Sequence, residues 1–458
     1  MIWRLLEELS GFVRSPIQRK SRGMIRSRPV MALYHQPWPP CAIPAARLDL
    51  TCPIEEEKTP NYSPERFYPI RLGQLLNGRY QVATKLGYGT NSTVWLARDL
   101  NRWKWSAEKY VAIKVKTTKS SNRGRSAENE IKILQHINQT NPKHRGWHFI
   151  RKLTDTFNLD SPYGSHPCLV LEPLREPLWL YCSRYIGGVI PPDILKILLQ
   201  MILLGLDYLH TECHTIHADL KPDNIMIRIE DPKMFEKDAT DEYNNPLPEK
   251  QLDDRTIYLS RNNYGPLTQP TGIIQLVDFD LAVRSMPGKL YYGAIQGEKY
   301  RAPEVILNSG YSYSADIWSL GVMLWDLLEK KSLFSPLTLG DGTAHDDLTH
   351  LAQIGALLGP TPHDLVNKGR RSALFYQESG ELKRPSRVPR NSNLDSTLTC
   401  MSGEEKTRFI RFVKRMITWR PEDRSTAKEL LGDPWLYKDF PQDGTVEGNG
   451  YGNSIESN

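Results

Sequence analysis

The spacing of apolar residues changes once along the chain, and this change constrains the fold more than any other feature of the sequence. Between residues 80 and 171 the apolar residues form short alternating segments separated by turn or polar residues, which is typical of an antiparallel sheet. Strands are expected at residues 80–86, 93–98, 110–116, 149–157 and 167–171, with one helix at 126–137. Beyond Pro191 the pattern is mostly helical. A sheet-rich part followed by a helix-rich part predicts an α+β fold with two lobes, and ligands favour the cleft between such lobes.

The two ends of the chain have the composition of tails. Residues 1–60 are rich in proline and arginine, and no acidic residue interrupts residues 14–48. This composition predicts a basic, disordered segment. Apolar residues at helical spacing in front of the arginines leave two alternatives open, an organellar targeting segment and a basic docking arm. Residues 438–458, which end in a stretch rich in Gly, Asn and Ser, are predicted to be a flexible tail.

The overall composition excludes several classes of protein. The net charge, 59 − 53 = +6, is too small to indicate a nucleic-acid-binding protein, so no direct contact with nucleic acid is expected. Six cysteines at irregular spacing favour a reducing compartment over a disulfide framework. The most apolar long window, residues 194–209, contains Lys196, Gln200 and Asp207, and therefore predicts an amphipathic helix rather than a membrane span.

A glycine turn is expected between the first two strands. Gly87 and Gly89 follow Leu86, and Val94 lies in the next expected strand. Glycine lets backbone amides approach phosphate oxygens closely, because no Cβ stands in the way. A simple hairpin would use the same glycines, and Ser92 stands where the full phosphate-binding pattern has a third glycine.

Two charged residues follow this turn. Lys114 comes after Ala112 at the end of an apolar strand, where its ammonium could face the same phosphates from below. Glu130 lies in the expected helix and could hold that ammonium in place, and Glu128 is the alternative for this role.

The strongest local signal is the sequence HADLKPDN at residues 217–224, directly after an apolar helix. Asp219 supplies a base, Lys221 a cation that can face a phosphate, and Asn224 a metal ligand, all in one loop. Asp278 then follows an apolar strand and offers a carboxylate suited to a hard divalent cation. Farther along, a glutamate and an arginine could form a structural ion pair; they are Glu304 and Arg424.

In their joint order these motifs resemble those of the protein kinase family, over roughly residues 80–436. The resemblance implies a bilobal kinase domain at residues 80–437, with an antiparallel-sheet N-lobe at 80–173 and a mainly helical C-lobe at 174–437. It implies transfer of the γ-phosphoryl group of ATP, with Mg²⁺, to serine or threonine hydroxyls of proteins. Lys221, where tyrosine kinases have an Ala-Arg insert, disfavours tyrosine specificity.

The same resemblance implies a role for each site residue. Lys114 would bind the α- and β-phosphates and pair with Glu130, while Asp219 would orient the substrate hydroxyl and accept its proton. Lys221 would face the γ-phosphate. Asn224 and Asp278 would hold the magnesium ions. The other implied residues are Leu86, Gly87, Gly89, Val94, Ala112, Leu171 as gatekeeper, and Glu172 and Leu174 of the hinge around the nucleotide, with Arg301, Glu304, Asp316 and Arg424 as structural and substrate-loop residues.

Three features are similar to the SR-protein kinases in particular. The lead-in at residues 61–79 contains YPIRLGQLLNGR, Arg301 precedes Ala-Pro-Glu, and a polar insertion at about residues 230–271 resembles their spacer. The details look most like the SR-protein-kinase-like enzymes of filamentous fungi. This branch implies Arg/Ser-rich protein substrates such as splicing factors, a monomer, and a cytoplasmic location with nuclear access.

Several residues depart from the family pattern. Ala218 stands where the family has arginine, so no cation beside Asp219 would receive a phosphate from the activation loop, and we expect activity without phosphorylation of that loop. Asp280 stands where the family has glycine, and could tune metal affinity or hinder loop motion. With Ser92, these departures motivate an alternative reading as a nucleotide-binding pseudokinase or scaffold.

The acidic docking positions of the SR-protein kinases align with Thr349 and Ala356, which weakens the assignment of an Arg-rich substrate. The neighbouring Asp346 and Asp347 are candidates to replace them. A further alternative is therefore an active serine/threonine kinase with other substrates. A metal-binding module, the remaining alternative, would use His210, Cys213, His214 and His217.

Overall fold

The structure is a computed structural model that describes residues 33–118, 127–261, 264–265, 271–334, 346–383 and 392–442. The chain forms two compact units. The first contains the residues up to Tyr181 together with Met201–Gly288, and the second contains Cys182–Gln200 and the residues from Lys289 onward. Met201–Gly288 thus belongs to the unit that carries the sheet.

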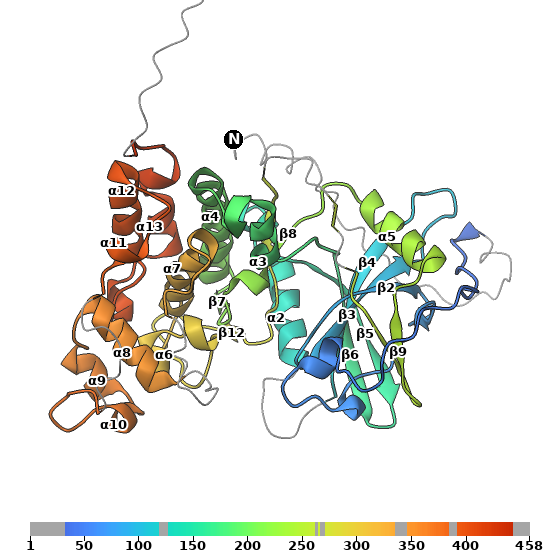
Figure 1. Ribbon diagram of the computed structural model, residues 1–458, viewed down its shortest axis with the longest axis horizontal. Coiled ribbons are helices and arrows are strands. Elements are labelled where there is room, and N and C mark those ends of the chain that lie inside the picture. Colours follow the sequence, from blue (N-terminus) through green and yellow to red (C-terminus); the bar gives the residue numbers. More distant parts are fainter. Residues whose placement is uncertain are drawn as a thin grey trace, which may run out of the picture. The chain divides into compact units, whose positions relative to one another are not determined.

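A six-stranded antiparallel sheet is the main element of the first unit (Figure 1). Its strands are β1 (Leu75–Leu76), β2 (Tyr80–Gly89), β3 (Ser92–Asp99), β4 (Tyr110–Lys116), β5 (Leu153–Ser161) and β6 (Gly164–Leu171), in the order β1-β2-β3-β4-β6-β5. The strands expected at residues 80–86, 93–98, 110–116 and 167–171 are confirmed. The strand expected at residues 149–157 begins only at Leu153, because a 3₁₀ helix, η4 (Arg145–Phe149), precedes it.

The two faces of β4 have different environments. Ile113 and Val115 pack in a buried cluster with Trp95 and other apolar residues of the sheet. Because successive side chains on a strand point to opposite faces, Lys114 and Lys116 lie on the other face. Helix α2 (Ala127–Gln139), which confirms the helix expected at residues 126–137, supplies a partner for both lysines there.

Short strands hold two loops of the first unit in place. They are β7 (Thr215–Ile216), β8 (Ile225–Ile227), β11 (Ile274–Leu276) and β12 (Val283–Arg284). Strand β8 pairs with β11, and β7 pairs with β12. Since residues 217–224 connect β7 to β8 and residues 277–282 connect β11 to β12, the pairing keeps these two loops side by side.

The apolar window at residues 194–209 forms α4 (Pro192–Asp207), which continues as a π-helical turn (Tyr208–Glu212). By length and composition alone, Pro192–Glu212 is apolar enough to cross a membrane. However, 67% of its most apolar window is buried within the protein, which is typical of a core helix. Lys196, one of the residues that suggested an amphipathic helix, is buried and pairs with Glu405 at 2.9 Å.

The second unit is helical, as expected for the region beyond residue 191. Its helices are α6 (Pro303–Ile306), α7 (Ser314–Leu328), α8 (Asp347–Leu358), α9 (His363–Lys368), α10 (Ser372–Phe375), α11 (Leu394–Thr397), α12 (Gly403–Lys414) and α13 (Ala427–Leu431). Helix α7 is buried on nearly all sides. Its Trp318 stacks on Phe334, and its Trp325 packs against Phe409 of α12.

The N-terminal segment is not a solvated tail from residue 33 onward. We call residues 33–67 the strap. The backbone of Trp38 forms two hydrogen bonds with the side chain of Gln81 in β2, at 2.8 and 2.9 Å. Glu56 of η2 (Glu55–Lys58) pairs with the fully buried Lys85 of β2. The prediction of disorder was therefore wrong for residues 33–60. Single aromatic and charged side chains hold this segment in place, and it lacks the periodic apolar pattern that predicts a packed helix or strand. Residues 1–32 lie outside the described residues.

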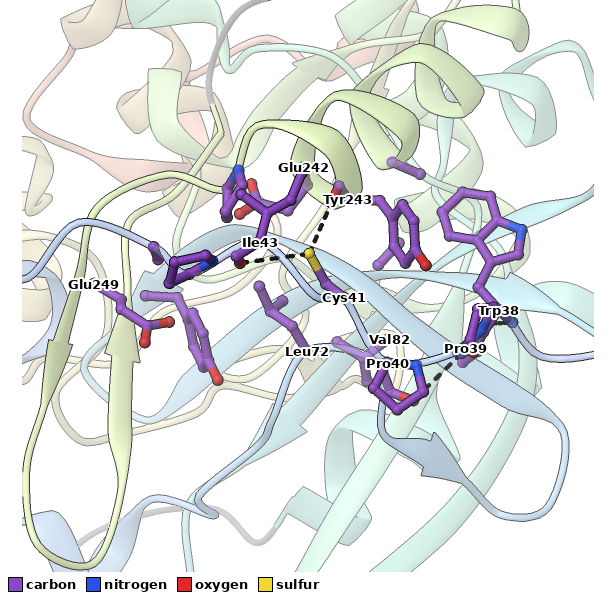
Figure 2. A pocket seen from close by; sticks show the side chains of 18 of the residues that line it. Trp38, Pro39, Pro40, Cys41, Ile43, Leu72, Val82, Glu242, Tyr243 and Glu249 are labelled. Atoms are coloured by element: carbon purple, nitrogen blue, oxygen red, sulfur yellow. Dashed lines mark hydrogen bonds between the residues drawn. The ribbon is translucent and has the colours of Figure 1, made fainter.

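The spacer packs against both the strap and the sheet. It contains α5 (Lys233–Asn244), β9 (Glu249–Gln251) and β10 (Thr256–Tyr258). Lys250 of β9 pairs with Glu57 of the strap at 2.9 Å. Residues of the strap, the sheet and α5 line an open pocket of about 280 Å³. In this pocket, drawn in Figure 2, the thiol of Cys41 donates to the backbone carbonyl of Tyr243, at 2.9 Å. The polar insertion, as far as the structure describes it, is thus a folded layer of the first unit.

We expect the stability of this layer to depend on pH through Asp238. This carboxyl group is buried in α5, and burial raises its pKa to about 6 although the cation of Arg261 opposes the shift. The ionised group destabilises the folded state above this pKa, and the effect disappears below the unfolded pKa of about 4. Asp238→Asn should therefore raise the free energy of unfolding by roughly 2 kcal/mol at pH 7.5, where thermal unfolding would be measured. This gain in the free energy of unfolding should shrink as the pH falls toward 4.5. A gain that does not depend on pH would contradict the raised pKa of Asp238.

Candidate functional site

Three side chains of the loop at residues 217–224 converge. The Nζ atom of Lys221 donates to Oδ2 of Asp219 at 2.7 Å, and Nδ2 of Asn224 donates to the same oxygen at 2.9 Å. Nδ2 of Asn224 also donates to the backbone carbonyl of Asp219 at 2.8 Å, so the loop closes on itself. The ring of His217 lies 3.0 Å from the carbonyl of Val277, which ties this loop to the one that carries Asp278.

Lys114 joins the sheet, helix α2 and the second loop. Its Nζ atom lies 2.8 Å from Oε1 of Glu130 and 2.7 Å from Oδ1 of Asp278. Burial opposes the charge of Lys114, but the carboxylates of Asp278 and Glu130 outweigh it and hold the pKa of the lysine above its ordinary value. Burial likewise opposes ionisation of Asp278, while Lys114 and Lys116 hold its pKa below the usual range. Lys114 and Asp278 are therefore charged at neutral pH, and the expected partner Glu130 is the one that meets Lys114.

A second lysine completes this network, and the sequence reasoning missed it. Nζ of Lys116 lies 2.7 Å from Oδ2 of Asp280 and 3.2 Å from Oε2 of Glu130. The signal was present, since a lysine two residues after Lys114 must share its face of the strand. In the described part of the chain, the only group of three possible metal ligands that lie within 4.8 Å of one another is Glu130, Asp278 and Asp280. The proposed metal-binding module around His210 does not form such a group.

The register of the sheet aligns the residues expected around the nucleotide. Gly87 of β2 lies opposite Val94 of β3, and Val94 lies opposite Lys114 of β4. Ala112 of β4 lies opposite Leu171 of β6. Leu86 and Gly89 also belong to β2. The glycine turn, the lysine and the gatekeeper position therefore follow one another across neighbouring strands.

The segment after β6 has a cationic neighbour that the sequence reasoning also missed. Arg151 donates two hydrogen bonds to the backbone carbonyl of Glu172, from Nε at 3.2 Å and from Nη2 at 3.0 Å. Burial lowers the pKa of Arg151 to about 10, although the nearby Glu172 opposes the shift. Leu174 is buried next to this segment. Arg151 thus fixes the backbone at one of the two hinge positions.

The remaining expected residues belong to the second unit. Arg424 forms a doubly hydrogen-bonded ion pair with Glu304, at 2.7 and 2.8 Å, and both side chains are fully buried. Arg301 pairs with Asp347 at 2.9 Å. Asp316 is fully buried in α7. These residues stabilise the helical unit and its loop before α6.

The residues of the first unit fit a nucleotide and a divalent cation. Asn224 and Asp278 offer the amide and carboxylate oxygens that hard cations prefer. The side chain of Asp278 keeps 38% of its surface exposed, so a ligand can reach it. Lys114 and Lys221 provide ammonium groups for phosphate oxygens. These side chains therefore fit the nucleotide and the divalent cation that the fold implies.

This combination of sheet, helical unit and paired loops defines a protein kinase. The family model described as protein kinase domain matches residues 80–436, and the chain belongs to the protein kinase family. It is 37% identical to a serine/threonine protein kinase of Aspergillus fumigatus, over 85% of this chain and 92% of that protein. It is 30% identical to the serine/threonine-protein kinase SRPK of Physarum polycephalum, over 83% and 91% of the two chains.

One further relative and one solved structure are also similar to this chain. The chain is 28% identical to protein kinase dsk1 of Schizosaccharomyces pombe, over 83% of this chain and 85% of that protein. A crystal structure of a kinase domain superimposes with a TM-score of 0.60 at 25% identity, covering 81% of this chain and 99% of the other. The chain is thus a serine/threonine protein kinase related to the SR-protein kinases, and this class uses ATP and a divalent metal.

Proposed function

We propose that this kinase transfers the γ-phosphoryl group of ATP, with Mg²⁺, to serine hydroxyls of Arg/Ser-rich proteins such as splicing factors. The observation that carries the catalytic part is the convergence of Lys221 and Asn224 on one carboxylate oxygen of Asp219. The substrate part is supported by relatives named SRPK and SRSF protein kinase 3. We also propose that the protein is a monomer in the cytoplasm with access to the nucleus.

The side chains of the first unit divide the work of this transfer. Asp219 accepts a hydrogen bond from the attacking hydroxyl, orients it and takes up its proton. Lys221 neutralises charge beside that carboxylate and faces the transferred group. Lys114, held by Glu130, binds the phosphates, and Asn224 and Asp278 would hold the magnesium. When bound, Mg²⁺ neutralises phosphate charge and helps to align the groups.

We propose that this activity does not require phosphorylation of the activation loop. Ala218, next to Asp219, offers no cation for a phosphate. In the second unit, Gln296 anchors the loop through neutral hydrogen bonds instead. Its Nε2 donates to the carbonyl of Ala315 at 2.8 Å and to Ser319 at 2.9 Å, and its Oε1 accepts from the amide of Ala302 at 2.9 Å. An uncharged side chain thus holds the loop before α6, and these contacts need no phosphate.

One observation favours different substrates for the same enzyme. Asp347 accepts from both Arg301 and Arg371, at 2.9 and 3.0 Å. Asp346 caps α8 by accepting from the amides of Leu348 and Thr349. Both carboxylates that were candidates to replace the acidic docking residues therefore already have intramolecular partners. An active serine/threonine kinase with substrates that are not Arg-rich is the second candidate.

The test compares matched peptides as phosphoryl acceptors. We expect the purified full-length kinase, treated with phosphatase beforehand, to transfer labelled γ-phosphate to an Arg-Ser repeat. A Lys-Ser repeat has the same charge but lacks the planar guanidinium, so it should be phosphorylated more weakly. Equal rates on both repeats and on a generic protein would remove the Arg/Ser assignment. Transfer that needs prior activation by another kinase would remove loop independence, and bound nucleotide without any transfer would favour the pseudokinase.

A further inference from the structure

Asp280 stands where related kinases have glycine, and the structure gives this aspartate a specific partner. Lys116 lies 2.7 Å from Asp280, and the lysine side chain is only 5% exposed. The backbone at residue 280 does not need a glycine, because the left-handed φ of 63° in this loop belongs to Asp278. The extra carboxylate is therefore accommodated without backbone strain.

The five charged groups form a continuous chain of ion pairs. Asp278 contacts Lys114, which contacts Oε1 of Glu130; Oε2 of the same Glu130 contacts Lys116, which contacts Asp280. The two ends of this chain lie two residues apart on one loop. Glu130 thus contacts the loop indirectly through two lysines, Lys114 and Lys116. The sequence pattern of the family provides only the connection through Lys114.

Charge balance makes Lys116 and Asp280 depend on each other. Glu130, Asp278 and Asp280 bring three carboxylates together within 4.8 Å, and two lysines offset them. Without Lys116, one lysine would face three carboxylates, and Asp280 would repel the two others. Without both Lys116 and Asp280, the remaining lysine, Glu130 and Asp278 would form the usual set. Loss of the lysine alone should therefore be worse than loss of both.

We propose that Lys116 and Asp280 form a positioning pair that holds Asp278 and α2 in the arrangement used for phosphoryl transfer. Neither residue contacts the substrate in this role, since both act through Glu130 and Asp278. The proposal rests on the proposed kinase function.

The experiment is a double-mutant cycle with Lys116→Met, Asp280→Asn and the combined variant. The affinity for a fluorescent ATP analogue with Mg²⁺, and the kcat and KM for ATP, are measured for each. We expect Lys116→Met to weaken nucleotide binding and to lower kcat/KM about tenfold, Asp280→Asn to have a smaller effect, and the combined variant to recover most of the loss. Lys132→Met, which removes an exposed lysine of α2, should change neither quantity.

The alternatives give different results. If Asp280 is a metal ligand, Asp280→Asn alone should raise the Mg²⁺ concentration needed for half-saturation and should not rescue Lys116→Met, which would overturn the proposal. Additive effects of the two substitutions would overturn it as well. Thermal unfolding of all variants separates a loss of folding from a loss of positioning. If the unmodified protein transfers no phosphate, the proposed function fails, whereas the coupling in nucleotide affinity still tests the pair.

Discussion

Replacement of Asp219 with alanine is expected to lower kcat for phosphoryl transfer by about 10²- to 10⁴-fold, the contribution typical of a positioned acid–base group. The substitution removes the oxygen on which Lys221 and Asn224 converge, and with it the acceptor for the proton of the attacking hydroxyl. The KM for ATP should change little, because Lys114, Glu130 and Asp278 remain in place. A kinetic assay with saturating peptide and ATP measures both quantities.

The matched control is Asp223→Ala in the same loop. Asp223 is also an aspartate of this loop, but its side chain is exposed, and it takes no part in the hydrogen bonds that converge on Asp219. We expect this variant to keep nearly full activity. Equal losses for both variants would mean that the loop tolerates no change, and retention of activity in Asp219→Ala would contradict the role of this carboxylate.

The residues that the sequence predicted well belong to short patterns. Asp219, Lys221 and Asn224 lie within six positions, so their spacing alone places them in one loop. The strands β2, β3 and β4 were predictable because their short apolar segments are separated by turn or polar residues, although the structure buries them on both faces. In these cases the information that determines the structure is local.

The features that were missed depend on contacts between distant segments. Lys116 meets Asp280 across 164 positions. Lys85 pairs with Glu56 of the strap, a segment that has the composition of a disordered tail. Arg151 donates to a backbone carbonyl, and because every residue has one, the sequence does not indicate this partner. Charge complementarity over such separations cannot be recognised before the fold brings the partners together, which is why composition gave the wrong result for residues 33–60.

A second large effect is expected at the ion pair between Glu304 and Arg424. Both side chains are fully buried, and Arg424 donates through Nη1 and Nη2 to the two carboxylate oxygens. Glu304→Ala would leave the guanidinium buried without a carboxylate, with hydrogen bonds to backbone carbonyls such as that of Thr418 and with the centre of the Trp318 ring 4.9 Å away. Removing one member of a buried pair typically costs about 3–5 kcal/mol, because the remaining charge loses its partner but stays away from water.

This cost should appear as a fall of about 10 °C in the midpoint of thermal unfolding of the helical unit, measured by calorimetry. The matched control is Arg420→Ala, which breaks an Arg–Asp pair with Asp364 whose side chains are 41% and 43% exposed. Because water solvates both charges of that pair, its loss should change the midpoint little. Glu304→Leu combined with Arg424→Met should be less harmful than Glu304→Ala, since no charge is then stranded. If the double substitution instead destabilises the unit more than the single one, the cost comes from lost packing around these side chains and not from the unpaired charge.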